Sequence, residues 1–131
     1  MAERFAMDWL RRELMVTLLG PAELPGGFMY PPEFIRVVEL GLTDLEPWRI
    51  LEGEELAQRL DGLGERYPTR LLVPFARRID NDDVGCWDLR RGDGRVSIIH
   101  DFASPGWEQQ AEFDGFYAWL RQAVEDLIEY D

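Results

Sequence analysis

The sequence predicts a single α+β domain in which N-terminal and C-terminal helices pack on an antiparallel β-sheet that includes a central hairpin. Apolar residues recur at helical spacing near both ends of the chain, whereas residues 84–102 alternate with the period of two that is typical of strands. Helices followed by strands and then by a helix indicate the α+β class. The 131 residues, of which 46% are hydrophobic, suit one core, and we assign residues 1–131 to one domain.

The first predicted helix runs from Arg4 to Leu19. Glu13 is the only charged residue on its apolar side, where the other residues recur at helical spacing: Phe5, Ala6, Trp9, Leu10, Leu14 and Thr17. The stretch GPAELPGG at residues 20–27 ends this helix, because glycine stops helices and proline cannot continue them.

A second, shorter helix is predicted where Pro31 and Pro32 precede the segment EFIRVVEL. Proline suits the first turn of a helix, and Gly41 provides the C-terminal stop. The inner face of this helix is expected to comprise Phe34, Val37 and Val38.

A short strand at residues 48–51 and a third helix at residues 54–63 are predicted next. The apolar side of that helix consists of Leu56, Leu60 and Leu63. The apolar residues 71–73 then predict a strand that ends at Pro74, at a sheet edge or a bulge, because proline lacks a backbone N–H.

The predicted hairpin comprises the segments VGCWDL and RVSIIHDF, residues 84–89 and 95–102. They are separated by RRGDG, whose two glycines permit positive backbone angles in the turn. Alternation in the second arm places Val96, Ile98 and His100 on one face. The other face then carries Ser97, Ile99 and Asp101.

The last predicted helix runs from about Gln109 to Ile128 and is expected to cover the sheet. It has the strongest periodic pattern in the chain, formed by Phe113, Phe116, Tyr117, Leu120, Val124, Leu127 and Ile128. Trp119 lies away from the centre of this stripe, and we therefore expect it to be partly exposed.

The charge of the chain argues against two classes of partner. Its 26 acidic residues outnumber 14 basic residues, all arginine, and give a net charge of −12. A field of this sign repels phosphate backbones and anionic membranes, which disfavours nucleic-acid and membrane binding and leaves a basic protein, a cation or no specific partner as the possibilities. The single cysteine, the lack of a signal-peptide pattern and the lack of a long apolar run predict a cytoplasmic protein.

No cofactor site, metal site or catalytic residue is predicted. A calcium loop beginning at Asp80 would have Asp82 and Gly85 in suitable places, but its fifth and twelfth positions would be Val84 and Arg91. Structural zinc sites use paired cysteines and histidines, which this sequence lacks.

A thiol–imidazole pair remains geometrically possible, because Cys86 and His100 could be neighbours in a regular hairpin. Such a cysteine more often behaves as a small buried apolar residue. A metal-dependent or Cys-His enzyme is therefore the least favoured of the functional alternatives.

The stretch DNDDVGCWDL, residues 80–89, has the strongest features of a protein-binding surface. Tryptophan concentrates binding energy at interfaces, and surrounding carboxylates steer association with a basic partner. The candidate interaction surface comprises Asp80, Asp82, Asp83, Trp87, Asp88, Asp101 and Trp107.

Taken together, three segments resemble the SUKH superfamily, of the Smi/Knr type. They are LLVPFARRIDNDDVGCWDL, RVSIIHDFASPGWE and EFDGFYAWL, and PPEFIRVVELG is similar to the earlier helix of that family. The resemblance covers about residues 28–125, and its specificity lies in the order of short motifs. The chain departs from the family pattern in two surface loops, where it has Gly41-Leu42-Thr43 and the DNDD stretch in place of glycine-rich turns.

This resemblance implies an α+β domain without enzymatic activity. Bacterial members are largely immunity proteins that neutralise polymorphic toxins, often nucleases, and an acidic inhibitor can occupy a basic substrate channel. We therefore expect a toxin-immunity protein, with a housekeeping regulatory or scaffold protein on the same fold as the alternative. The sequence leaves the oligomeric state open.

Overall fold

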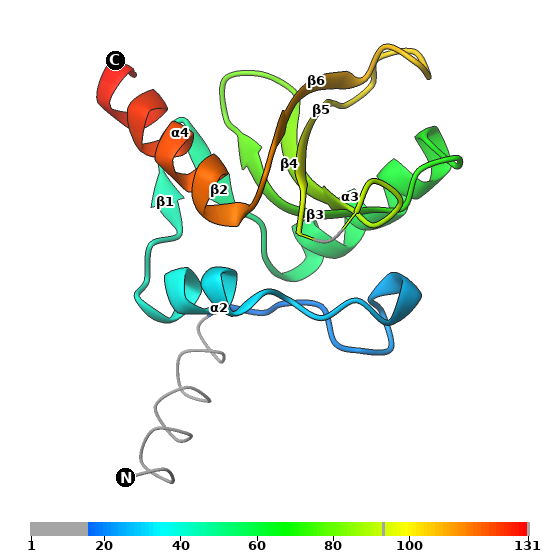
Figure 1. Ribbon diagram of the computed structural model, residues 1–131, viewed down its shortest axis with the longest axis horizontal. Coiled ribbons are helices and arrows are strands. Elements are labelled where there is room, and N and C mark those ends of the chain that lie inside the picture. The colour runs from blue at the N-terminus through cyan, green and yellow to red at the C-terminus, as the bar shows by residue number, and fades with distance from the viewer. Residues whose placement is uncertain (1–15, 93, 131) are drawn as a thin grey trace, which may run out of the picture.

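The computed structural model describes residues 16–92 and 94–130, and it confirms the α+β class. Of the predicted helix at 4–19, residues 4–15 lie outside the described residues, and residues 16–19 are not helical, so the prediction is wrong for that part. Within them a short 3₁₀ turn, Pro25–Gly27, precedes the helices α2 (Pro32–Glu39), α3 (Gly53–Arg66) and α4 (Phe116–Glu129) (Figure 1). The strands are β1 (Asp44–Leu45), β2 (Trp48–Ile50), β3 (Leu72–Arg78), β4 (Asp83–Asp88), β5 (Val96–His100) and β6 (Gln109–Phe113).

The six strands form one antiparallel sheet in which strands that follow each other along the chain are neighbours. The predicted central hairpin is confirmed as β4 and β5, which pair from Asp83 opposite His100 to Trp87 opposite Val96. The predictions for residues 33–40, 48–51 and 54–63 match α2, β2 and α3 to within three residues. In the described part of the chain, every helix is too short or too polar to cross a bilayer.

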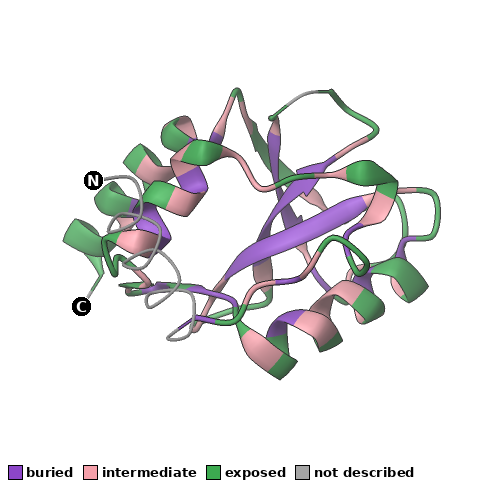
Figure 2. Cartoon of the chain, turned by 90° about the horizontal axis from the view of Figure 1, so that it is seen from below, coloured by how far each residue is buried: buried purple, intermediate pink, exposed green. Residues whose placement is uncertain are grey.

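Helices cover both faces of the sheet. α3 packs against β3 on one face, whereas α2 and α4 lie together on the other (Figure 1). Buried residues concentrate in the central strands, and the outer turns of the helices are exposed (Figure 2).

Aromatic rings fill the core between the sheet and helices α2 and α4. Phe75 of β3 lies 4.6 Å from Trp87 of β4, measured between ring centroids, and 4.8 Å from Trp119 of α4. Phe34 of α2 contacts Phe75, Trp87 and Phe116 at 5.2–6.0 Å. Burial of each ring stabilises the fold by about 1.5–3 kcal/mol, and each ring pair adds about 0.5–1.5 kcal/mol.

The predicted end of a strand at Pro74 is wrong, although the predicted bulge is present. β3 continues to Arg78 as an interior strand between β2 and β4, and its register shifts between Pro74 and Ala76. β2 pairs with β3 only at residues 76–78, so within the described residues no strand pairs with Pro74 on that side, and a residue that cannot donate a backbone hydrogen bond is accommodated next to the bulge.

The predicted start of the last helix is also wrong. Residues 109–113 form β6, and α4 begins at Phe116 after the extended Gly115. Because the predicted stripe was aligned on Phe113, it was rotated relative to the buried side of the helix, although two of its members, Phe116 and Leu120, do pack on the core. The buried residues of α4 are Phe116, Trp119 and Ala123, and Trp119 is only 1% exposed, contrary to prediction.

Gly85 is closely packed against the ring of Phe75. A Cβ atom there would lie 3.0 Å from Cζ of Phe75, and Trp87 and Trp119 hold that ring in place. We expect Gly85→Ala to lower the free energy of unfolding by about 1–3 kcal/mol, as overpacked cores do. Gly64→Ala is the matched control, because its Cβ would meet nothing within 4 Å on α3 and alanine favours helix. Urea denaturation showing no loss for Gly85→Ala would contradict this account.

Candidate protein-binding surface

Two loops meet at one end of the sheet: the β3–β4 turn at 79–82 and the β5–β6 loop at 101–108. The backbone N–H of Asp101 donates to the carbonyl oxygen of Asp82 at 3.0 Å. Beside this bond, Nδ1 of His100 lies 2.8 Å from Oδ1 of Asp83. The two loops therefore form one continuous surface. We define the sheet-end surface by four residues of these loops: Asp80, Asp82, Phe102 and Trp107.

The β3–β4 turn is ordered by its own polar side chains. Oδ1 of Asn81 accepts a hydrogen bond from the backbone N–H of Asp83 at 2.8 Å. Arg78 donates to both carboxylate oxygens of Asp80, at 2.8 and 2.9 Å, and these bonds lower the pKa of Asp80. The Asp82 side chain is exposed, and its carboxylate has no hydrogen bond or ion pair within the described residues. It is thus available to a basic partner.

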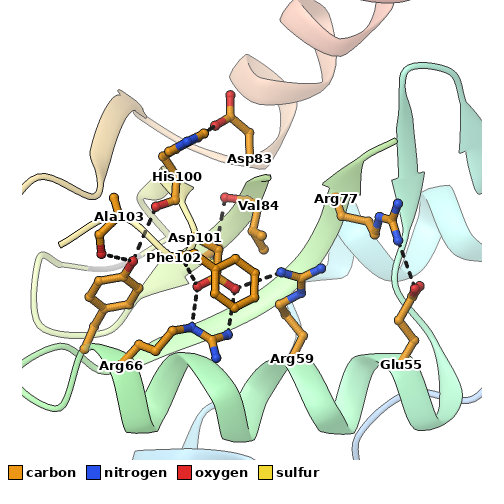
Figure 3. A network of polar contacts seen from close by, with 12 residues as sticks. Glu55, Arg59, Arg66, Arg77, Asp83, Val84, His100, Asp101, Phe102 and Ala103 are labelled. Carbon is orange, nitrogen blue, oxygen red and sulfur yellow. Dashed lines mark hydrogen bonds and ion pairs between the residues drawn. The ribbon is translucent and has the colours of Figure 1, made fainter. Parts of the chain in front are cut away.

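The start of the β5–β6 loop is held by a buried carboxylate. Asp101 accepts hydrogen bonds from Arg59 at 2.8 Å and from Arg66 at 2.6 and 2.8 Å, and both arginines belong to α3 (Figure 3). Burial alone raises the pKa of Asp101, but the hydrogen bonds from Arg66 and Arg59 outweigh it, so that the pKa lies below its usual value. The hydroxyl of Tyr67 also donates to the carbonyl oxygen of Ala103 at 2.8 Å.

The end of the same loop is held by a second ion-pair network. Arg70 donates to Asp88 at 2.8 Å and to Glu108 at 2.9 Å, while Glu108 accepts from the backbone N–H of Gly106 at 2.6 Å. Burial tends to raise the pKa of Glu108, but the hydrogen bonds from Arg70 and the backbone lower it below its usual value. The β5–β6 loop is therefore anchored at both ends to residues that precede β3.

Between these anchors the loop presents two large aromatic side chains to solvent. Phe102 is 63% exposed and Trp107 is 79% exposed. Phe102 has a φ of +69°, a backbone conformation that a bulky residue rarely adopts. The guanidinium carbon of Arg66 lies 4.2 Å from the centroid of the Phe102 ring, so the arginine that binds Asp101 also supports this ring.

Three members of the predicted interaction surface are buried. Trp87 is 1% exposed and belongs to the aromatic core, whereas Asp88 and Asp101 are 2% and 1% exposed and belong to the ion-pair networks. Their burial corrects the expectation that they could meet a partner directly. Asp83 is half-buried and bonded to His100, so the exposed part of the predicted set comprises Asp80, Asp82 and Trp107.

The possible thiol–imidazole pair is not brought together. Cys86 pairs with Ser97, whereas His100 pairs with Asp83 three residues away along β4. The Cys86 side chain is fully buried, and burial raises its pKa well above the ordinary value of a thiol. Among residues 16–92 and 94–130, no group of three His, Cys, Asp or Glu side chains is placed to hold a metal ion.

The sequence interpretation missed Phe102, Arg66 and Arg70. Strand alternation continued through residue 102 and gave no indication that the chain turns there with a positive φ. The two arginines lie on and just after a helix, 35 and 18 residues from the carboxylates they bind. A phenylalanine directly before the turn residues of ASPG was the one local signal of an exposed aromatic.

Comparison with known proteins adds no relative: no family model, curated protein or solved structure matches this chain. The geometry of the sheet-end surface and the motifs of the sequence are the observations from which a function can be inferred.

Proposed function

We propose that this protein is a non-enzymatic binding module that captures a basic protein through its sheet-end surface. The observation that carries this proposal is the exposure of Phe102 and Trp107, 63% and 79%, on a loop anchored at both ends by buried ion pairs. Exposed apolar groups that gather on one surface indicate an interaction site, and tryptophan is among the commonest interface hot spots.

The anchoring of the loop supports binding rather than flexibility. A loop that is already ordered loses little conformational entropy when a partner docks, so more of the contact energy appears as affinity. The positive φ of Phe102 is strained for a bulky side chain, and such strain concentrates at functional sites. The Asp101–Arg66 interaction holds the residue in this conformation.

The charge of the chain supports a basic partner. The net charge is −12, and beside the β5–β6 loop Asp82 presents a carboxylate that has no partner among residues 16–92 and 94–130. Opposite charge on the partner would accelerate association and fix its orientation. The order of SUKH-like motifs supports the narrower proposal that the partner is a toxin domain, often a nuclease, and that this protein acts in the cytoplasm as its immunity protein.

The experiment is capture from lysate followed by affinity measurement on the captured protein. We expect Phe102→Ala and Trp107→Ala each to weaken binding at least about 30-fold, the effect of losing about 2 kcal/mol at a hot spot. The matched control is Met29→Ala, which removes an 82% exposed apolar side chain beside the β4–β5 turn, at the opposite end of the sheet.

Two further results would test the location of the interface and the immunity role separately. Full affinity in both the Phe102→Ala and the Trp107→Ala variant would mean that the partner binds a surface other than the sheet-end surface. If the captured protein is a toxin, wild-type protein should restore growth of cells that express it, whereas the Trp107→Ala variant should not. A captured protein that is not toxic would retain the binding role and contradict the immunity role.

A further inference from the structure

Helix α4 carries a second group of exposed apolar side chains, remote in sequence from the two sheet-end loops. Val124 and Leu127 are 39% and 40% exposed, and Ile128 is 69% exposed. Tyr117, Val124 and Ile128 are spaced by seven and four residues, which places them along one side of the helix. Apolar residues that line one solvent-facing stripe indicate a surface that is covered in the functional state.

Two charged residues accompany this stripe. Arg121 and Glu125 are exposed on the same side of α4, and neither has a hydrogen-bond or ion-pair partner among the described residues. A groove of about 480 Å³ runs beside them, bordered by Phe113 and Val124. We define the α4 outer face as Tyr117, Arg121, Val124, Glu125 and Ile128.

We propose that the α4 outer face binds the same face of a second copy of this chain, with the two helices antiparallel. A two-fold axis at the level of residue 123 would place Arg121 of each copy opposite Glu125 of the other, because the two positions are equally distant from the axis. A parallel arrangement would instead oppose identical charges. The face is therefore self-complementary in one orientation, which an isologous dimer requires.

The apolar stripe suits the same orientation. Val124 lies next to the axis, where it would contact Val124 of the second copy. Tyr117 and Ile128 lie at opposite ends of the stripe, so Tyr117 of one copy would approach Ile128 of the other. The groove beside Val124 provides space for a side chain of the second copy. This inference uses none of the residues of the sheet-end surface, so it does not depend on the proposed function.

The test is sedimentation velocity of the full chain at increasing concentration, in about 0.15 M salt, where charges more than about 8 Å apart are largely screened. We expect a monomer–dimer equilibrium for the wild-type chain. Arg121→Glu and Glu125→Arg should each weaken the dimer at least about 10-fold, because each opposes like charges twice.

Mixing the two variants gives the decisive measurement. In a mixed dimer every contact again joins a glutamate to an arginine, so the mixture should dimerise within about threefold of the wild-type affinity. Glu125→Arg also changes the net charge from −12 to −10, and the smaller repulsion between copies would by itself favour association. If this variant nevertheless dimerises more weakly, the loss must come from the local pairing of residues 121 and 125. Arg90→Glu, an exposed arginine at the β4–β5 turn, is the matched control and should dimerise like the wild type.

Three results would overturn this proposal. They are a monomer at all concentrations, dimers that both charge variants leave unchanged, and variants that do not recover when they are mixed. The first would assign the α4 outer face to another occupant, such as residues 1–15 or a different protein. Unchanged melting curves by circular dichroism will show that the variants remain folded.

Discussion

Replacing Asp101 with asparagine is expected to lower the free energy of unfolding by about 3–5 kcal/mol, the usual effect of breaking a buried ion pair. The Asp101 side chain is fully buried and accepts three hydrogen bonds from Arg59 and Arg66 and one from the backbone N–H of Phe102. An asparagine has the same shape, but its amide N–H groups would oppose arginine donors. The guanidinium groups of Arg59 and Arg66 would then lose the carboxylate with which they form ion pairs.

Urea denaturation of the Asp101→Asn variant measures this loss. Asp82→Asn is the matched control, because it makes the same chemical change on an exposed carboxylate of the adjoining turn, and surface changes of this kind are usually within about 0.5 kcal/mol. A loss below about 1 kcal/mol in the Asp101 variant would mean that the network stabilises the loop without stabilising the whole fold.

The same network makes stability depend on pH in a defined direction. The pKa of Asp101 is below its usual value in the folded state, so unfolding raises it and the unfolded chain binds more protons. The stabilisation by Asp101 is therefore fully present above the unfolded pKa, about 4, and is lost as pH falls through the folded pKa. The difference in stability between wild type and Asp101→Asn should accordingly be largest near neutral pH and shrink in acid.

Local sequence patterns predicted the parts of the fold that depend on local structure. The hairpin of β4 and β5 follows from alternation around a glycine-containing turn, and α2 follows from Pro32, Gly41 and three apolar residues between them. These signals suffice because a tight turn brings its own two strands together and a short amphipathic helix has one face to bury.

The remaining elements depend on contacts between residues far apart in sequence. The segment QQAEF has no strand pattern of its own, and it becomes β6 because β5 offers an edge for it to pair with. Asp88 and Asp101 are acidic residues beside a turn and a loop, and local rules place such residues in solvent. They are buried because Arg70 and Arg66, distant in sequence, supply the compensating charge, which a local pattern cannot reveal.

The candidate surface was predicted in part for the same reason. Asp82 was correctly predicted to lie in an exposed turn, whereas the sequence left open which tryptophans are exposed, and Trp107 is one of them. The exposure of Phe102 requires its positive φ, which the hydrogen bonds to Asp101 maintain. The ion pair between Asp101 and Arg66 therefore helps to keep the Phe102 ring accessible to a partner.

Replacing Phe34 with alanine is expected to lower the free energy of unfolding by about 3–5 kcal/mol, as large-to-small changes in aromatic cores do. Phe34 is completely buried and contacts four rings, at centroid distances of 5.2–6.0 Å. Removing its ring leaves a cavity between α2, β3, β4 and α4, and the sheet cannot collapse to fill it. For a chain of this length the loss corresponds to a fall in melting temperature of about 10–20 °C.

The comparison of Phe34→Ala with Phe34→Leu shows why the core is aromatic. Leucine retains most of the buried apolar volume but loses the edge-to-face contacts with Phe75, Trp87 and Phe116. If hydrophobic burial dominates, Phe34→Leu should cost about 1–2 kcal/mol, well below the alanine variant. Equal losses in the two variants would show that ring geometry outweighs buried volume. A loss below about 1 kcal/mol in Phe34→Ala would mean that α2 contributes little to the cooperative unit, and that the sheet and α4 fold without it.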